Sequence, residues 1–213
     1  MTRGRFITFE GIEGCGKSTQ IGLLADHLRA AGRNVVLTRE PGGTPAAEAI
    51  RAILLDPAQD ALSPTTELLL YAAARAQHVH QVIRPAVKAG AVVLCDRFAD
   101  STEAYQGGGR ALSHETIDIL RNIATDGMGP DCTILLDLPA AEGLARTRSR
   151  GELDRIEGEP LAFHERVRAA FLAIAAREPE RVIVINAAAS VEAIAGEIGP
   201  RMDALLCAEA QEA

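Results

Sequence analysis

The sequence predicts an α/β protein whose mostly parallel sheet is covered by helices on both faces. Short apolar runs with the character of buried strands alternate along the chain with longer segments of helical spacing. The length of 213 residues suits one domain, and 47% hydrophobic residues supply a substantial core. The expected strands are residues 6–9, 35–37, 91–95, 133–136 and 182–185.

Helical spacing predicts the elements between these strands. Gly32 stands where a helix C-terminal glycine would, and Ser63 followed by Pro64 is typical of a helix start. Pro85 lies inside the longest helical pattern and is expected to end or kink it. The expected helices are residues 18–31, 46–55, 64–89, 113–125, 140–149, 160–178 and 190–207.

Composition narrows the classes of partner. The net charge of −7 argues against a broad nucleic-acid surface, so a bound anion must be met by local positive groups. No apolar run approaches bilayer length, and the N-terminal segment lacks a signal-peptide core, so we expect no membrane partner. The widely spaced cysteines suggest neither a zinc site nor a disulfide framework and favour a reducing cytoplasm.

A glycine-rich loop joins the first expected strand to the first expected helix. Residues 11–18, with the sequence GIEGCGKS, match G-x-x-x-x-G-K-[ST] at every fixed position. Glycines allow backbone N–H groups to turn towards an anion, and the helix N-terminus adds partial positive charge. Lys17 could reach the outer phosphates and Ser18 could bind Mg²⁺. The alternative is a turn that merely connects the two elements, but the strand–loop–helix context favours a phosphate-binding loop.

Charged or polar residues follow every expected strand, which predicts one lined crevice at the carboxyl edge of the sheet. Asp96 ends a buried strand in the manner of an aspartate that holds Mg²⁺ directly or through water, although a helix cap or salt bridge is the alternative. Arg97 beside it suggests a second anion close to the metal. The residues at this edge are Glu10, Thr38, Arg39, Glu40, Asp96, Arg97, Asp137 and Asn186.

Further stretches could complete such a site. Tyr71 and Arg75 share a helix face and could read a base, although two packed side chains are the commoner explanation of such a pair. In residues 100–110 the glycines could let the backbone approach a ligand closely. Residues 146–157 carry several arginines, which are either a solvated face or a lid that closes over a nucleotide.

Together these stretches closely resemble bacterial thymidylate (dTMP) kinases. The matching segments are FITFEGIEGCGKST, TREPGGT, YAAARAQH, DRFADSTEAYQGGGR, PDCTILLDLPAAEGLARTRSRGELDRIE and VIVINAAASVEAI, which are collinear and span almost the whole chain. The resemblance implies one P-loop nucleoside-monophosphate kinase domain over residues 1–213, with a five-stranded parallel sheet and a short lid at about 146–158. It also implies Mg²⁺ as cofactor, ATP as phosphoryl donor, dTMP as acceptor, and a homodimer.

Roles for individual residues follow from the resemblance alone. It places Glu13 near the sugar 3′-hydroxyl, Arg97 on the acceptor phosphate, Tyr71 on the thymine ring, Arg75 on a base carbonyl and Tyr105 beneath the sugar. Tyr71 stands where the family often has Phe, so its hydroxyl needs a partner or water if it is buried. The residues implied for binding ATP and its phosphates are Gly11, Ile12, Glu13, Gly14, Cys15, Gly16, Lys17, Ser18, Thr19, Arg148 and Arg155. The residues implied for binding dTMP are Glu13, Glu40, Arg51, Tyr71, Arg75, Arg97, Ser101, Thr102, Tyr105 and Gln106. The implied metal ligands are Ser18 and Asp96.

The implied catalytic residues are Lys17, Arg97 and Arg150. Some family members carry an arginine in the P-loop after the acidic residue, where this chain has Gly14, so the resemblance assigns the catalytic arginine to the lid at Arg150. Three alternatives compete with this reading. Another nucleoside-monophosphate kinase, acting on dUMP or a purine nucleotide, would use the same scaffold. A regulatory GTPase would need an N-K-x-D-type guanine reader, whereas the last strand leads into INAAAS. A non-catalytic nucleotide sensor would be expected to lack Lys17, Asp96 or the basic lid, all of which are present.

Overall fold

The computed structural model describes residues 3–149, 151 and 153–207 and contains a five-stranded parallel sheet. The strands are β1 (Phe6–Glu10), β2 (Val35–Arg39), β3 (Val92–Asp96), β4 (Cys132–Asp137) and β5 (Val182–Asn186), in the spatial order β2-β3-β1-β4-β5. All five expected strands are confirmed, each with an end shifted by one or two residues. Every residue of β1, the central strand, is buried, as expected of a strand covered on both faces.

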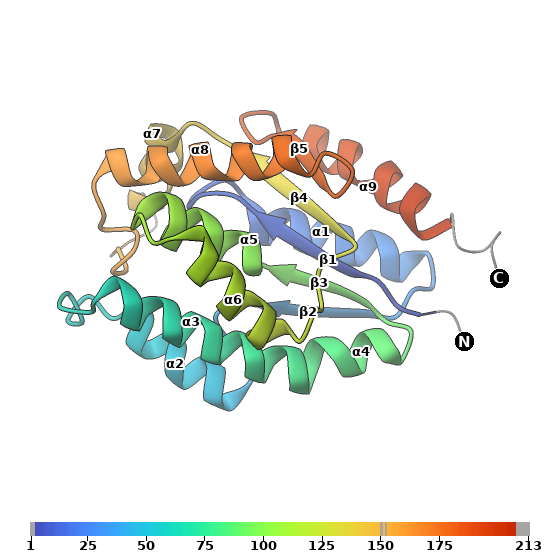
Figure 1. The fold of residues 1–213 in the computed structure, drawn as a ribbon. Helices are drawn as coiled ribbons and strands as arrows, with labels where there is room; N and C mark the ends of the chain where they lie inside the picture. The colour runs from blue at the N-terminus through green and yellow to red at the C-terminus, as the bar shows by residue number, and fades with distance from the viewer. Residues whose placement is uncertain (1–2, 150, 152, 208–213) are drawn as a thin grey trace.

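Helices cover both faces of this sheet (Figure 1). The helices α1 (Lys17–Ala30) and α9 (Val191–Cys207) pack together on one face. The other face carries the long segment α3 (Pro64–His78), η1 (Val79–Ile83) and α4 (Arg84–Lys88), together with α5 (Ala99–Thr102), η2 (Glu103–Gly109) and α8 (Leu161–Arg177). The remaining helices are α2 (Pro45–Leu55), α6 (His114–Thr125) and α7 (Ala140–Arg148).

The expected helix ends are confirmed where a specific local contact defines them. Gly32 has a φ of 76°, and the N–H of Arg33 donates to the carbonyl of Leu28, which closes the end of α1 as a Schellman motif. At the start of α3, the Ser63 hydroxyl accepts from the N–H of Thr66, with Pro64 in the first turn.

Pro85 was expected to end or kink its helix, and of these two outcomes the helix does not end at the proline. The helix continues to Lys88, but the turn before the proline widens to the π-helix η1. Proline has no N–H to donate and its ring crowds the preceding turn, which a wider turn can accommodate. Residues of η1 and α4 then pack on the sheet, where Val79, Ile83 and Val87 join Phe6, Val93 and Phe98 in one apolar cluster.

Residues 99–109 form the helices α5 and η2 rather than an open loop. The sequence suggested that their glycines could let the backbone approach a ligand; in the structure two of them approach another helix closely. A Cβ on Gly108 would lie 2.6 Å from the Cβ of Ala170, and one on Gly109 would lie 2.5 Å from the Phe163 ring. Both neighbours belong to α8, so these glycines allow η2 to pack closely against that helix. The consequence for function is indirect, because this contact fixes the position of Tyr105 and Gln106.

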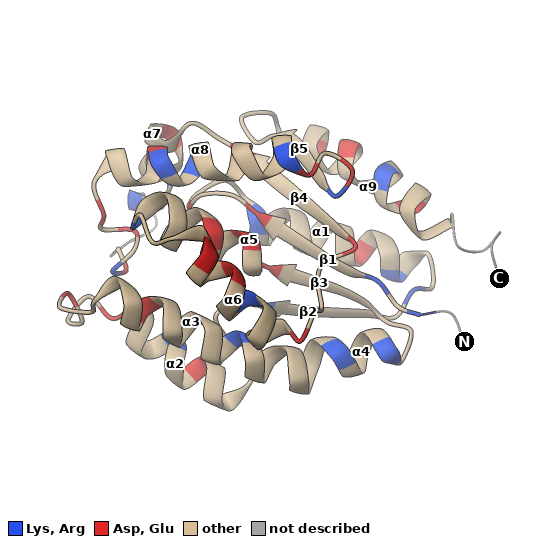
Figure 2. Ribbon diagram, in the orientation of Figure 1, with Lys and Arg blue, Asp and Glu red and all other residues tan. Residues whose placement is uncertain are grey.

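Charged residues are spread over many elements. Figure 2 shows Lys and Arg interspersed with Asp and Glu along the helices and at the strand ends. Within the described part of the chain, no helix is long and apolar enough to cross a membrane.

Candidate active site

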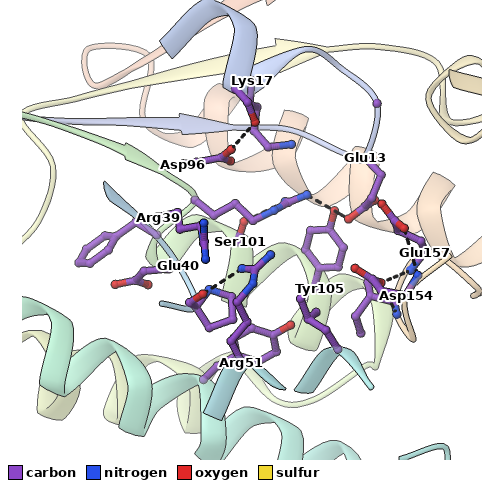
Figure 3. Close-up of a pocket in the computed structure, with 18 of the residues that line it drawn as sticks. Glu13, Lys17, Arg39, Glu40, Arg51, Asp96, Ser101, Tyr105, Asp154 and Glu157 are labelled. Atoms are coloured by element: carbon purple, nitrogen blue, oxygen red, sulfur yellow. Dashed lines mark hydrogen bonds and ion pairs between the residues drawn. The ribbon is translucent and has the colours of Figure 1, made fainter. Parts of the chain in front are cut away.

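A cavity of about 320 Å³ lies at the carboxyl ends of β1, β2 and β3 (Figure 3). It is lined by residues from the glycine-rich loop, the segment after β2, helix α3, the end of β3, η2 and the segment that follows α7. The lining residues that the sequence analysis named are Glu13, Gly14, Gly16, Lys17, Ser18, Thr19, Arg39, Glu40, Arg51, Tyr71, Arg75, Asp96, Arg97, Ser101, Tyr105 and Gln106.

The glycine-rich loop curls around the amino group of Lys17. Its Nζ donates to the carbonyl oxygens of Gly11 and Ile12, at 3.1 and 2.9 Å, so the side chain folds back over its own loop. Gly16 caps α1 with a φ of 93°, which places the N-terminus of that helix at the cavity. The arrangement supplies a cation and backbone N–H groups at one end of the cavity, as anion binding requires.

Gly14 has no space for a side chain. Its φ is 71°, and a Cβ there would collide with the backbone carbonyl of Gly143 on α7, while a Cβ on Gly143 would collide in turn with the carbonyl of Glu13. The loop and α7 therefore meet backbone to backbone. An arginine at position 14 would require this contact to open.

Ser18 and Asp96 lie side by side next to Lys17. The Ser18 hydroxyl donates to Asp96 Oδ2 at 3.1 Å. A hydroxyl and a carboxylate are oxygen ligands of the kind that Mg²⁺ takes, usually with few protein ligands besides water and phosphate. Among the described residues no group of three or more His, Cys, Asp or Glu side chains gathers as a metal site.

Arg97 joins the two halves of the cavity. One amino group, Nη1, donates to the Gly11 carbonyl at 3.0 Å, and the other, Nη2, donates to Glu13 Oε1 at 3.0 Å. Its backbone is held in the left-handed region, with a φ of 72°, by a hydrogen bond from its N–H to the carbonyl of Phe9. Such strain in a non-glycine residue is typical of functional sites.

Glu13 accepts two hydrogen bonds on one oxygen. Tyr105 donates to Oε1 at 2.6 Å beside Arg97, whose guanidinium lies 5.0 Å from the Tyr105 ring centre. Burial alone would raise the pKa of the Glu13 carboxyl, but Arg97, the His164 ring 3.2 Å from Oε2 and Lys17 together hold this pKa well below its usual range. Glu13 is therefore ionised at neutral pH and can accept a hydrogen bond from a ligand.

Helix α3 and the segment after β2 form the opposite wall. Arg75 donates to Glu40 Oε2 at 2.7 Å and to the Phe98 carbonyl at 3.0 Å. Burial and the neighbouring Arg39 lower the pKa of Arg51, whose guanidinium also donates to the Pro41 carbonyl. Tyr71 is half-buried, and burial raises the pKa of its hydroxyl, so it is neutral.

Several expected residues lie outside the cavity. Gly11, Ile12 and Cys15 support the loop from behind, and Thr102 is buried on α5. Arg148 ends α7 without lining the cavity. Arg155 points to helix α3, where its Nη2 lies 2.6 Å from Glu67 Oε2, and its Nε donates to the Leu54 carbonyl. Arg150 lies outside the described residues.

The single crevice expected along all five strands is wrong in its extent. Asp137 and Asn186, at the ends of β4 and β5, do not line the cavity, and Asp137 instead forms a paired contact with Arg168 at 2.7 and 2.8 Å. Glu10 is fully buried and accepts from the N–H of Phe98 and the hydroxyl of Ser101. It supports the site from behind rather than lining it.

Burial of Glu10 predicts a pH dependence of stability. Burial, followed by repulsion from Asp100, raises the pKa of Glu10 from 4.5 to about 8, so the folded protein holds a proton that the unfolded chain releases above pH 4.5. The contribution of Glu10 to the free energy of unfolding should therefore fall as pH rises from 4.5 to 8, by up to about 1.4 kcal/mol per pH unit. Chemical denaturation of wild type and Glu10→Gln across this range measures it. The variant should show the flatter pH dependence, and equal slopes would contradict the prediction.

Sequence reasoning missed part of the lining. Asp154, Ile156 and Glu157 line the cavity from the segment that follows α7, in which the sequence analysis assigned ligand contacts only to arginines. Leu55 and Phe98 also line it, and neither carries a chemical signal in the sequence. Helical placement of residues 99–109 was missed as well, because glycine-rich π-helical turns have no periodic pattern.

Comparisons with known proteins agree on one family. The family model described as thymidylate kinase matches residues 9–198. The chain is 59% identical over 198 residues to a thymidylate kinase of Geobacter sulfurreducens, covering 90% of this chain and 93% of that protein. It is 56% identical over 203 residues to one of Pseudomonas putida, covering 95% of each. The crystal structure of thymidylate kinase from Ehrlichia chaffeensis superposes with a TM-score of 0.78 at 35% identity, covering 94% of this chain and all of that one.

Proposed function

The chain belongs to the thymidylate kinase family, and on that premise we propose which of its residues bind the two substrates and assist transfer of the γ-phosphoryl group from ATP to dTMP. It is an ATP-dependent nucleoside-monophosphate kinase, and its products are dTDP and ADP. The observation that supports our assignment of residues is the cavity itself, in which the glycine-rich loop and the Arg97–Glu13–Tyr105 cluster face one space.

A coupled assay for ADP formation tests the reaction. Purified protein should form ADP rapidly with dTMP and slowly with dUMP, dCMP, dGMP or AMP. Ready phosphorylation of dGMP or AMP without formation of dTDP would contradict the assignment.

At the donor end, Lys17 is assigned to the outer phosphates of ATP. Its Nζ already lies within the loop that would hold the phosphates, and its partners there are two carbonyl oxygens and the Cys15 sulfur, which phosphate oxygens could replace. Ser18 and Asp96 are assigned to Mg²⁺, which would neutralise phosphate charge when bound. Removal of the metal with a chelator should stop the reaction.

At the acceptor end, Arg97 is assigned to the phosphate of dTMP. An acceptor monophosphate is substantially ionised near neutral pH, because its second pKa is about 6. No general base is therefore needed, and the chemistry depends on positioning two anions close together. The ring of Tyr105 and the ionised carboxylate of Glu13 are assigned to the sugar, with Glu13 accepting from its 3′-hydroxyl.

The wall formed by α3 and η2 is assigned to the base. The half-buried Tyr71 supplies an aromatic ring, and Arg75, held by Glu40, supplies donors for a base carbonyl. Ser101 and Gln106 complete the polar lining. Thr102 is assigned to the acceptor side although it does not line the cavity, and its buried hydroxyl has no hydrogen-bond partner among the described residues. Arg51 is assigned to the acceptor side with Glu40.

We assign the catalytic arginine to Arg150. The Gly14–Gly143 contact leaves no room for an arginine in the P-loop, so positive charge for the transition state must come from another segment. Arg150→Ala should lower kcat by about 10²-fold or more, since arginine fingers act on that scale or above. Binding of ATP and dTMP should weaken much less, because the contact forms mainly in the transition state. Steady-state kinetics with calorimetry measures both; an unchanged kcat with weaker ATP binding would make Arg150 a ground-state clamp. Arg148 and Arg155 remain assigned to nucleotide binding or to bracing the lid.

We also propose that the chain forms a homodimer through α2, α3 and α6. These helices pack on one another and carry large exposed apolar side chains, namely Ile53, Leu69, Ile119 and Ile123. Ile123 is 71% exposed in the single chain, so a charge there should not disturb the fold of the protomer.

Sedimentation tests the pairing. Wild type should sediment at twice the 22.5 kDa of one chain, and Ile123→Glu at a single chain mass. Leu23→Glu, which alters an exposed apolar residue on α1, is the matched control and should stay dimeric. A wild-type protein that sediments as a single chain would contradict the proposal. The cytoplasm is the proposed location, in keeping with the free cysteines Cys15, Cys95, Cys132 and Cys207.

A further inference from the structure

Glu67 lies on α3 directly behind the wall assigned to the base. It does not line the cavity and is 1% exposed, yet it contacts three side chains from other segments. Arg110 donates to both of its oxygens at 3.2 Å, Arg155 lies 2.6 Å from Oε2, and Gln106 donates from Nε2 to Oε1 at 2.8 Å. Of these partners, only Gln106 also lines the cavity.

The chemistry of Glu67 fixes the orientation of the Gln106 amide. Two guanidinium groups keep Glu67 ionised and hold its pKa below the usual range, despite burial that would raise it. An ionised carboxylate can only accept hydrogen bonds. If the amide turned over, two oxygens would meet at 2.8 Å in a buried place, so Nε2 must face Glu67.

We propose that Glu67 is a positioning residue for base selection: by holding Nε2 of Gln106, it leaves the amide oxygen and one N–H facing the cavity in a fixed order. None of the described residues donates to Gln106 Oε1, so this oxygen is available to a ligand. The Gln106 amide oxygen is an acceptor and the N–H beside it is a donor, so together they are complementary to the edge of thymine or uracil that presents a ring N–H beside a carbonyl oxygen. Cytosine presents the reverse order, with an acceptor ring nitrogen and a donor amino group. This inference rests on the proposed dTMP kinase function.

Replacing Glu67 by glutamine removes the constraint and keeps the shape. A glutamine at position 67 can donate or accept, so the Gln106 amide can turn over and meet cytosine. The ratio of kcat/KM for dTMP to kcat/KM for dCMP should fall by about tenfold or more, a part of what a polar mismatch can contribute. The ratio for dTMP to dUMP should not change, because both bases present the same edge to Gln106.

Glu103→Gln is the matched control. Glu103 is also buried and forms a paired contact with an arginine, Arg177, at 2.7 and 2.9 Å, but it does not line the cavity or contact Gln106. The same chemical change there should leave both ratios at their wild-type values. A second control is Gln106→Leu: once the amide is gone, adding Glu67→Gln should not change the dTMP to dCMP ratio further.

The outcomes separate the inference from the reaction. A Glu67→Gln enzyme with the wild-type dTMP to dCMP ratio, or with a loss no larger than that of Glu103→Gln, overturns the inference and leaves the kinase function standing. A loss that persists in the Gln106→Leu background, or that extends to the dTMP to dUMP ratio, also overturns it, because it shows general loosening of the pocket. A wild-type protein that does not phosphorylate dTMP refutes the function itself. If Glu67→Gln does not fold, the double variant Glu67→Gln, Arg155→Met is used instead, because it also removes a guanidinium that would have lost its carboxylate partner. Any loss of turnover common to both substrates cancels in each ratio.

Discussion

Replacing Lys17 by alanine is expected to lower turnover of dTMP by at least about 10³-fold, because it removes the cation that we assign to the outer phosphates of ATP. Lys17 is the only cation in the glycine-rich loop, and position 14 cannot supply another because Gly14 lies against Gly143. The variant also loses the hydrogen bonds to Gly11 and Ile12 that close the loop, so ATP binding should weaken as well.

The assay follows ADP formation at saturating dTMP, with Lys88→Ala as the control. Lys88 is exposed on α4 and is the only other lysine of the chain, so its loss should leave turnover unchanged. Substantial activity in Lys17→Ala would show that Mg²⁺ and the lid arginines suffice without a lysine.

The second large effect is expected for Arg97→Ala, which should lower kcat/KM for dTMP by about 10³-fold, the scale of removing one partner of a buried ion pair. The variant loses the cation assigned to the acceptor phosphate and leaves the buried Glu13 carboxylate without its guanidinium partner. It also releases Tyr105 from the guanidinium that stacks on its ring.

Separate KM values locate this defect. The KM for dTMP should rise much more than the KM for ATP, because Arg97 contacts the loop at the Gly11 carbonyl and the Glu13 carboxylate and forms no hydrogen bond with Lys17, which is assigned to ATP. Arg84→Ala, which removes an arginine that pairs with Asp126 on the surface, should leave both unchanged. A normal KM for dTMP in Arg97→Ala would remove Arg97 from the acceptor phosphate.

The parts of the fold that the sequence predicted are those with a local signal. Period and apolar runs located β1 to β5, and the cap residues Ser63 and Gly32 located helix ends, because each acts through its immediate neighbours. For Pro85 the sequence left open whether the helix ends or kinks, because the effect of a proline depends on whether the preceding turn can widen. In the structure the turn widens, and Val79 and Ile83 from this turn pack in the apolar cluster with Phe6 and Val93.

The site was predictable where a residue belongs to the glycine-rich motif after β1 or stands beside a second charged residue at the end of a strand. Lys17 and Ser18 meet the first condition, Asp96 and Arg97 meet the second, and all four line the cavity. Asp137 also ends a strand but has no charged residue beside it, and it pairs with Arg168, a residue 31 positions away on α8, instead of lining the cavity. Glu67 illustrates the remaining limit: it reads as one more polar residue in a helix, and only the fold brings Arg110, Arg155 and Gln106 to it.

The contact between Gly14 and Gly143 restricts how the enzyme can vary. At Gly14 and Gly143 the loop and α7 approach so closely, main chain to main chain, that a side chain at either position would meet a backbone carbonyl. Substitution at either position adds at least a methyl group where there is no room, so the contact between the loop and α7 is either preserved with glycine or disrupted. Helix α7 runs from Ala140 to Arg148, so the close contact at Gly143 fixes the position of this helix relative to the glycine-rich loop. A substitution at Gly14 or Gly143 is therefore expected to displace the loop and α7 together.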